Sequence, residues 1–150
     1  MRRRGISPVI ATVILVAVAI AVAIAVAFWM TGIVGLFTGF EQLQITSAYA
    51  EGDETSGWTI TVEVKNTGTA AASIDNIFIN GKPISSYNTG NTTVVTVSPD
   101  VTSATVSVNP GETKTFTITI QPSGFSSGQS VEIKIHTAGG KEYPKLVVLP

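Results

Sequence analysis

The chain offers few side chains for metal, nucleophilic or acid–base chemistry. It has no cysteine and a single histidine, His136. A zinc site needs three or four nitrogen, sulfur or oxygen ligands, which one histidine without cysteines does not supply. His136 follows Glu132 and Lys134 at steps of two residues, which places it on the solvent side of a strand. We therefore expect an exposed structural histidine, with no metal and no cofactor.

A Ser-His-Asp hydrolase is also disfavoured. Such a site needs a serine and an aspartate beside the histidine. The aspartates are Asp53, Asp75 and Asp100, each in a turn-like setting, and no G-x-S-x-G sequence is present. The sequence therefore predicts that the protein is not an enzyme.

Oxygen ligands for Ca²⁺ are concentrated in the acidic run Glu51-Gly52-Asp53-Glu54. The run lacks the spacing of an EF-hand loop, so a solvated hairpin loop is the preferred interpretation. The formal net charge is −1, and without the three arginines of the first five residues six basic residues remain against ten acidic ones. A mildly acidic body disfavours nucleic-acid binding, which depends on a basic surface.

Hydroxyl and amide side chains offer sites for glycans. Asn91-Thr92-Thr93 is the one N-x-[ST] sequon, in a loop-like stretch, and it makes Asn91 the candidate N-glycosylation site. The chain also has 20 threonines and 13 serines. Threonine suits strand surfaces, and the same hydroxyls could carry O-linked glycans.

An apolar segment from residue 6 to residue 40 dominates the N-terminal part of the chain. Its 35 residues contain no Asp, Glu, Lys, Arg or His. Alanine at every second position from 17 to 27 would also fit a strand, but the segment is far longer than any strand. In hydrocarbon a helix satisfies its own backbone groups. We therefore predict one long helix that starts at Ser7 and Pro8, a capping residue followed by a favoured first helical residue.

The predicted helix has no polar side. A helix that is apolar all round is buried all round, in lipid or among other helices. Small residues allow helix backbones to approach closely in membranes, and Gly35 and Gly39 have small-xxx-small spacing. We expect the larger residues to pack in a core of such helices, and these are Ile6, Pro8, Ile10, Ile14, Val18, Ile20, Ile24, Phe28 and Trp29.

From residue 43 onward the pattern changes to β-strands. Apolar and polar residues alternate in residues 58–65, 115–120 and 131–136. Further strands are expected at residues 43–49, 77–79, 94–97, 105–108 and 145–149, and Asn80-Gly81 is a two-residue hairpin signal with Pro83 suggesting an edge strand. Short strands separated by turns predict an antiparallel, immunoglobulin-like β-sandwich over residues 41–150. The fold class is therefore α+β, with one long helix followed by an all-β domain.

The N-terminus resembles a known family. Arg2, Arg3 and Arg4 precede Gly5, and a basic tip before an apolar segment holds the N-terminus in the cytoplasm. The run from residue 2 to residue 12, R-R-R-G-I-S-P-V-I-A-T, and the Val/Ala/Ile/Leu helix after it closely resemble the start of archaeal type IV pilins. The resemblance implies that a prepilin peptidase cuts between Gly5 and Ile6. It would remove residues 1–5 as a leader and leave the helix, residues 6–40, on the mature protein.

The resemblance also implies a function, partners and a location. The protein would be the major subunit of an extracellular archaeal type IV pilus, with the helices in the filament core, the β domains outside, and adhesion as its role. Its partners would be copies of itself and the pilus assembly machinery. Before assembly it would lie in the cytoplasmic membrane with its N-terminus inside.

Two alternatives stay open from the sequence. Archaellins, the subunits of archaeal flagella, share this plan but usually have glycines where this chain has Ser7-Pro8, so a pilin ranks above an archaellin. Bacterial type IV pilins usually have a glutamate at the fifth mature position, where this chain has Ile10.

The second alternative is a single-pass membrane protein that displays an Ig-like binding module, which the residues also fit.

Overall fold

The computed structural model describes residues 8–88 and 94–150. Contacts between residues divide the chain into two compact units, Met1–Gly39 and Phe40–Pro150. The first unit contains the helix α1, and we call the second unit the β domain. Within the described residues the chain forms one α-helix, nine strands and one 3₁₀ helix.

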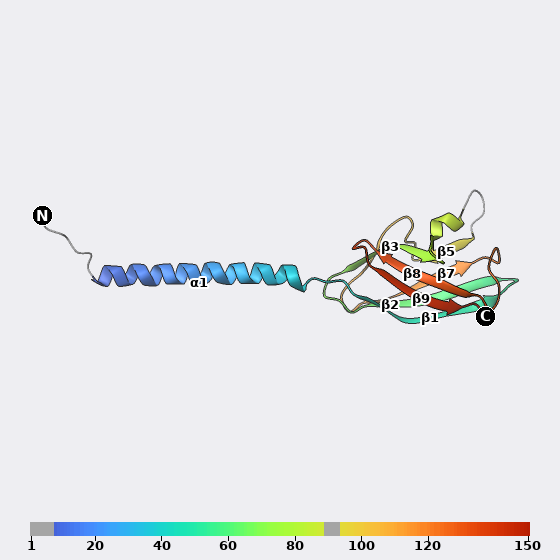
Figure 1. Ribbon diagram of the computed structural model, residues 1–150, viewed down its shortest axis with the longest axis horizontal. Helices are drawn as coiled ribbons and strands as arrows, with labels where there is room; N and C mark the ends of the chain where they lie inside the picture. The colour runs from blue at the N-terminus through green and yellow to red at the C-terminus, as the bar shows by residue number, and fades with distance from the viewer. Residues whose placement is uncertain (1–7, 89–93) are drawn as a thin grey trace. The chain divides into compact units, whose positions relative to one another are not determined.

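Helix α1 runs from Pro8 to Thr38 over 31 residues (Figure 1). Proline is favoured at a first helical position because its missing N–H has no partner there in any case. The predicted helix is confirmed, but α1 ends two residues before Phe40. Phe40 belongs to the β domain instead, because its backbone carbonyl accepts hydrogen bonds from the backbone N–H groups of Thr69 and Ala70.

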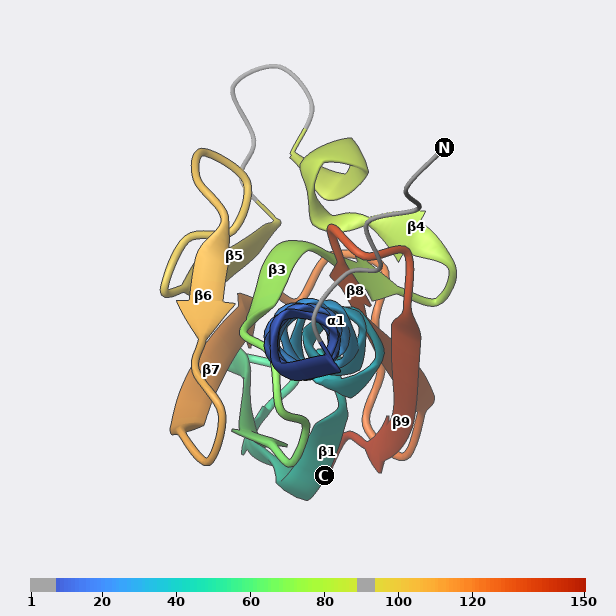
Figure 2. The same cartoon turned by 90° about the vertical axis from the view of Figure 1, so that its left-hand side faces the viewer.

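The β domain consists of two antiparallel sheets, and Figure 2 shows β7 and β9, one from each sheet, on opposite sides of the domain. The first sheet has the strand order β1 (Leu43–Asp53), β2 (Gly57–Asn66), β7 (Thr113–Ile120) and β5 (Val95–Ser98). The second has the order β4 (Lys82–Pro83), β3 (Ala72–Ile79), β8 (Ser130–Thr137) and β9 (Glu142–Val148), with β6 (Val106–Val108) also paired to β3. The 3₁₀ helix η1 (Ile84–Tyr87) follows β4. The predicted α+β class with an antiparallel sandwich is confirmed.

The core lies between the sheets and follows from the alternation in the sequence. Every second residue of β2 and β8, and of β7 from Phe116 to Ile120, is fully buried, as period-two side chains of a half-buried strand must be. The largest fully buried side chains include Trp58, Phe116, Ile118 and Ile133. These inward rows leave the alternate residues on the outer faces of the two sheets.

Two local features compare directly with the sequence. Asn80 and Gly81 have φ values of 49° and 76°, as a two-residue turn of the I′ type requires, and the predicted hairpin joins β3 to β4. The expectation that Asp75 lies in a turn is wrong. Asp75 lies within β3, at a register shift between Ile74 and Asn76 where the strand bulges.

Candidate functional site

The first candidate site is the surface of α1. The predicted packing residues from Ile10 to Trp29 are between 52% and 76% exposed, and Pro8 is exposed as well. The segment Pro8–Val34 is long and apolar enough to cross a membrane. Exposed apolar area carries a free-energy cost of about 25 cal/mol per Å² in water, so this surface requires lipid or other helices around it.

Two hydroxyl groups of α1, those of Thr12 and Thr31, are satisfied within the helix. Thr12 Oγ1 donates to the carbonyl of Val9 at 2.8 Å. Thr31 Oγ1 lies 3.0 Å from the carbonyls of both Ala27 and Phe28. Since these hydroxyls need no outside partner, they do not oppose burial of the helix among apolar groups.

Alanine produces hollows between the larger side chains of α1. One hollow is lined by Thr12, Val13, Val16, Ala17 and Ile20, and another by Ile24, Ala27, Phe28 and Thr31. Helices pack when the ridges of one enter such hollows of another, and small residues let the backbones approach. At 100° per residue the two sets of lining residues cover overlapping directions, with centres roughly 40° apart around the helix axis. Both hollows therefore lie on one side of α1, while its other sides also expose large apolar side chains.

The second candidate site is the start of the β domain, residues 40–42. The backbone N–H groups of Thr69 and Ala70 donate to the Phe40 carbonyl at 2.9 and 3.0 Å, and Thr67 donates to the Gln42 carbonyl at 2.7 Å. A Cβ on Gly68 would lie 2.4 Å from the Phe40 carbonyl oxygen. The turn that follows β2 therefore holds residues 40–42 by backbone hydrogen bonds, and only glycine fits at its closest point.

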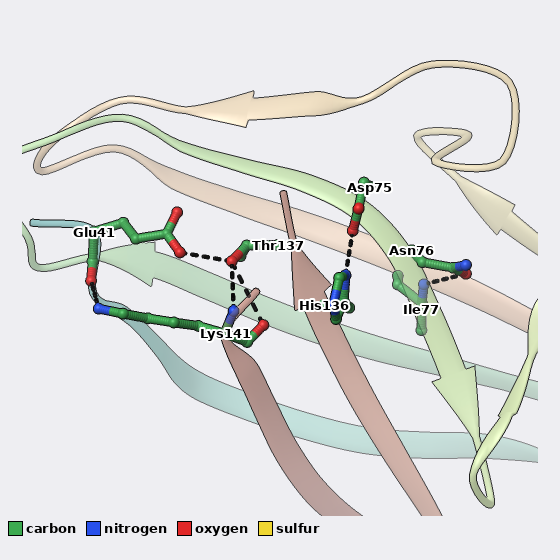
Figure 3. A network of polar contacts seen from close by, with 7 residues as sticks. All are labelled: Glu41, Asp75, Asn76, Ile77, His136, Thr137 and Lys141. Carbon is green, nitrogen blue, oxygen red and sulfur yellow. Dashed lines mark hydrogen bonds and ion pairs between the residues drawn. The ribbon is translucent and has the colours of Figure 1, made fainter. Parts of the chain in front are cut away.

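The turn between β8 and β9 holds the same residues from another side (Figure 3). Thr137 Oγ1 donates to Glu41 Oε1 at 2.6 Å, and Lys141 Nζ donates to the Glu41 carbonyl at 2.5 Å. A Cβ on Gly139 would lie 2.4 Å from Glu41 Oε1. Thr137 is fully buried, so its hydroxyl needs this partner.

Substituting Gly139 by alanine should displace the Glu41 carboxylate and break its bond to Thr137. We expect Gly139→Ala to destabilise the β domain by about 1 kcal/mol, the typical net value of one hydrogen bond, because the displaced group is the end of a flexible side chain. In a Glu41→Ala background the same substitution should lower the free energy of unfolding by less, because the carboxylate that the new Cβ would meet is absent. Urea unfolding of the full chain, followed by circular dichroism, measures all four members of this cycle. Equal costs in the two backgrounds would contradict the assigned contact.

His136 makes a polar contact with a carboxylate that the sequence analysis missed. Its Nδ1 lies 2.6 Å from Asp75 Oδ1, and about a third of each side chain is exposed (Figure 3). The Phe78 ring meets the imidazole edge to face, with centroids 6.1 Å apart. Asn76 is the register partner of His136 on β8, and the bulge in β3 brings the extra residue Asp75 next to the imidazole, so the contact links two strands of the second sheet. His136 is on the outer face, as expected, and has a structural partner there.

The acidic run of residues 51–54 is exposed, as predicted, but only Glu54 lies in the turn of the hairpin, because β1 continues through Asp53. The backbone N–H groups of Ser56 and Thr55 donate to Asp53 Oδ1 and lower the pKa of that carboxyl. Glu54 Oε1 accepts the backbone N–H of Ser127 at 2.9 Å. These oxygens serve the local structure, and in the described part of the chain no three His, Asp or Glu residues form a metal-binding group.

The carboxylate of Asp100 also accepts hydrogen bonds from neighbouring residues. The hydroxyls of Ser103 and Thr102 donate to its carboxylate and lower its pKa to about 2. Asp100 lies in a loop, in agreement with the sequence analysis, whereas Asp53 is the last residue of β1, next to the turn. Neither offers a free general base.

Several predicted site residues lie outside the described residues. These are the leader arginines Arg2, Arg3 and Arg4, the cleavage pair Gly5 and Ile6, and the sequon residue Asn91. Their roles stay predictions.

No family model matches this sequence, and no curated protein matches it. Among solved structures, the chain is similar to the archaeal flagellum of Methanospirillum hungatei strain JF1, with 20% identity over 94% of this chain and 88% of that chain and a TM-score of 0.51. It is also similar to the archaellum periplasmic stator protein FlaG from Sulfolobus acidocaldarius, with 22% identity over 71% of this chain and 99% of that chain and a TM-score of 0.46.

The first of these likenesses extends over both the helix and the β domain, since it covers 94% of the chain. At 20% identity it shows the fold. That structure is described as an archaeal flagellum, which is a filament and not an enzyme. The chain therefore shares the fold recorded for that archaeal flagellum, with an apolar N-terminal helix followed by an antiparallel β-sandwich.

Proposed function

We propose that the protein is the structural subunit of an extracellular archaeal type IV pilus. In this proposal α1 packs against copies of itself in the filament core, and the β domains form the outer layer. The observation that carries it is the surface of α1, which is apolar on every side and hollowed at Ala17 and Ala27. Such a helix is suited to several helical neighbours rather than to one face of a globular core.

The packing residues of the proposed core are Pro8, Ile10, Ile14, Val18, Ile20, Ile24, Phe28 and Trp29, together with Ile6. Lipid and a helical bundle are similarly apolar, so movement from membrane to filament would be driven by packing. The three leader arginines oppose this movement, because a cation at the bilayer centre costs about 2.5–3.5 kcal/mol on insertion scales. Cleavage between Gly5 and Ile6 would remove that obstacle.

Blocking the cleavage tests the proposal. We expect Gly5→Leu to keep Met1 on the protein, hold it in the membrane fraction and abolish surface filaments. Arg2→Lys is the matched control, because it keeps the leader charge and leaves Gly5 intact. N-terminal sequencing and electron microscopy of sheared cell-surface material provide the measurements.

Two results would contradict the proposal. One is a wild-type filament whose subunits begin at Met1. The other is a wild-type protein that begins at Ile6 but stays a detergent-soluble monomer with no filaments on the cells, which is the behaviour of a membrane-tethered β domain.

An archaellum subunit is the second candidate, because the fold is similar to that of an archaeal flagellum over 94% of this chain. The presence of Ser7-Pro8 at the start of the helix favours the pilus. A deletion strain separates the two functions. Loss of surface attachment with normal swimming supports a pilus, whereas loss of swimming supports an archaellum.

A further inference from the structure

The outer face of the first sheet is a regular array of hydroxyl groups. Antiparallel pairing places Thr59 beside Thr119 and Thr119 beside Thr96, and in the next row Thr61 beside Thr117 and Thr117 beside Ser98. Neighbouring strands are about 4.8 Å apart, and alternate residues along a strand are about 6.7 Å apart. We call these six residues the hydroxyl face.

The hydroxyls of this face have no protein partner within the described residues. Elsewhere in the β domain threonine hydroxyls bond to the protein, as at Thr67, Thr102 and Thr137. None of the six side chains makes such a bond, and all six are exposed or half-buried. They are therefore free to bond to an outside molecule.

These hydroxyls are also held in place before any ligand binds. Threonine is β-branched, so its χ1 angle is restricted, and the paired backbones fix the spacing of the rows. Groups already ordered lose little conformational entropy on binding. The face can therefore present several hydrogen-bonding groups to a repeating partner at low entropic cost.

The charges around the face limit the partner. The two rows contain no lysine or arginine, and β1 adds Glu51 beside Thr59 and Tyr49 beside Thr61. Glu63 lies in the next row, and the nearest lysine on this side of β2, Lys65, lies one row further from the hydroxyl face. Acidic residues beside the face, with no cation in the adjoining rows, disfavour nucleic acids and anionic polysaccharides. The outer face of the second sheet differs, since it carries the ion pair of Lys134 with Glu142 and the polar contact of His136 with Asp75.

An apolar partner is also disfavoured. Covering six hydroxyls without supplying hydrogen bonds has a cost for each group. The partner must therefore be neutral and must itself carry many donors and acceptors. Tyr49, which is 49% exposed, adds an aromatic ring at the β1 end of the second row, suited to the apolar side of a sugar.

We propose that the hydroxyl face, with Tyr49 at its edge, binds a neutral polysaccharide. This goes beyond the proposed filament and does not depend on it, because the face lies wholly within the β domain. A filament of such subunits would repeat the face along its length and strengthen weak single contacts through multivalency.

Binding is tested with the full chain in detergent, so that filament assembly is not required. Affinity electrophoresis in gels containing dextran or mannan, and sedimentation with microcrystalline cellulose or chitin, are the neutral probes. Alginate and heparin are the anionic probes. We expect retention by at least one neutral probe and by neither anionic one.

Matched variants assign the binding to the face. The double variant Thr61→Val and Thr117→Val keeps side-chain shape and removes two central hydroxyls, and we expect about tenfold weaker binding from the two lost hydrogen bonds. Thr105→Val and Ser130→Ala remove exposed hydroxyls outside the face and should leave binding unchanged. Circular dichroism checks the fold, and Thr96→Val on the edge strand β5 is the second variant if the double variant does not fold.

The proposal is overturned if none of the four neutral probes retains the protein, or if the double variant binds as well as Thr105→Val. It is also overturned if the double variant changes self-association in light scattering while no neutral probe binds, since the face would then be a contact between copies. None of these results affects the filament proposal, which depends on α1.

Discussion

A lysine at Ile20, near the middle of the apolar segment Pro8–Val34, is expected to abolish filaments. In a bundle of identical helices the substitution would place one unpaired cation at the same level in every subunit. A lysine at the centre of a membrane helix costs about 2.5–3.5 kcal/mol on insertion scales, and removal from water without a counter-ion is costly in a protein core as well. Electron microscopy of cell-surface material should show no filaments for Ile20→Lys.

The controls separate assembly from insertion and folding. Ile20→Leu keeps an apolar side chain of the same size and should still form filaments. Thr55→Lys adds the same charge at the exposed hairpin between β1 and β2 and should also do so. Cell fractionation should find Ile20→Lys in the membrane, because the rest of the segment is still apolar enough to span it. Normal filaments from Ile20→Lys would mean that α1 is not in a filament core.

The elements set by periodicity could be predicted well from the sequence. The segment that forms α1 is too long for a strand and apolar throughout, so a helix could be predicted for it. The alternation of apolar and polar residues in β2, β7 and β8 predicted both the strands and which of their residues are buried. Strand β3 was expected only at residues 77–79 but begins at Ala72. Asp75 and Asn76 are adjacent polar residues that break the alternation, because the strand bulges between Ile74 and Asn76.

Contacts between distant parts of the chain were not predictable in the same way. The position of His136 on an outer face follows from alternation, but its partner Asp75 is 61 residues away. The hydroxyl face was visible in the sequence only as abundant threonine, which suits any strand surface. Its rows require the pairing of β2 with β7 and of β7 with β5, and that order is a property of the fold. The same limit applies to Glu41, which meets a threonine 96 residues further on.

Asn66 should be the most damaging polar residue to remove from the β domain, because it is fully buried and bonds to three backbone groups. Its Nδ2 donates to the carbonyls of Ala70 and Val108, both at 2.8 Å, and its Oδ1 accepts the N–H of Gly68 at 2.9 Å. Asn66→Ala removes all three bonds, two of them at the turn that holds Phe40, so we expect a loss of about 3–5 kcal/mol. Asn76→Ala is the control, since Asn76 is only partly buried and bonds to a neighbouring N–H, and it should cost about 1 kcal/mol or less. Urea unfolding of both variants gives the comparison, and equal losses would show that Asn66 does not organise the turn that holds the first residues of the domain.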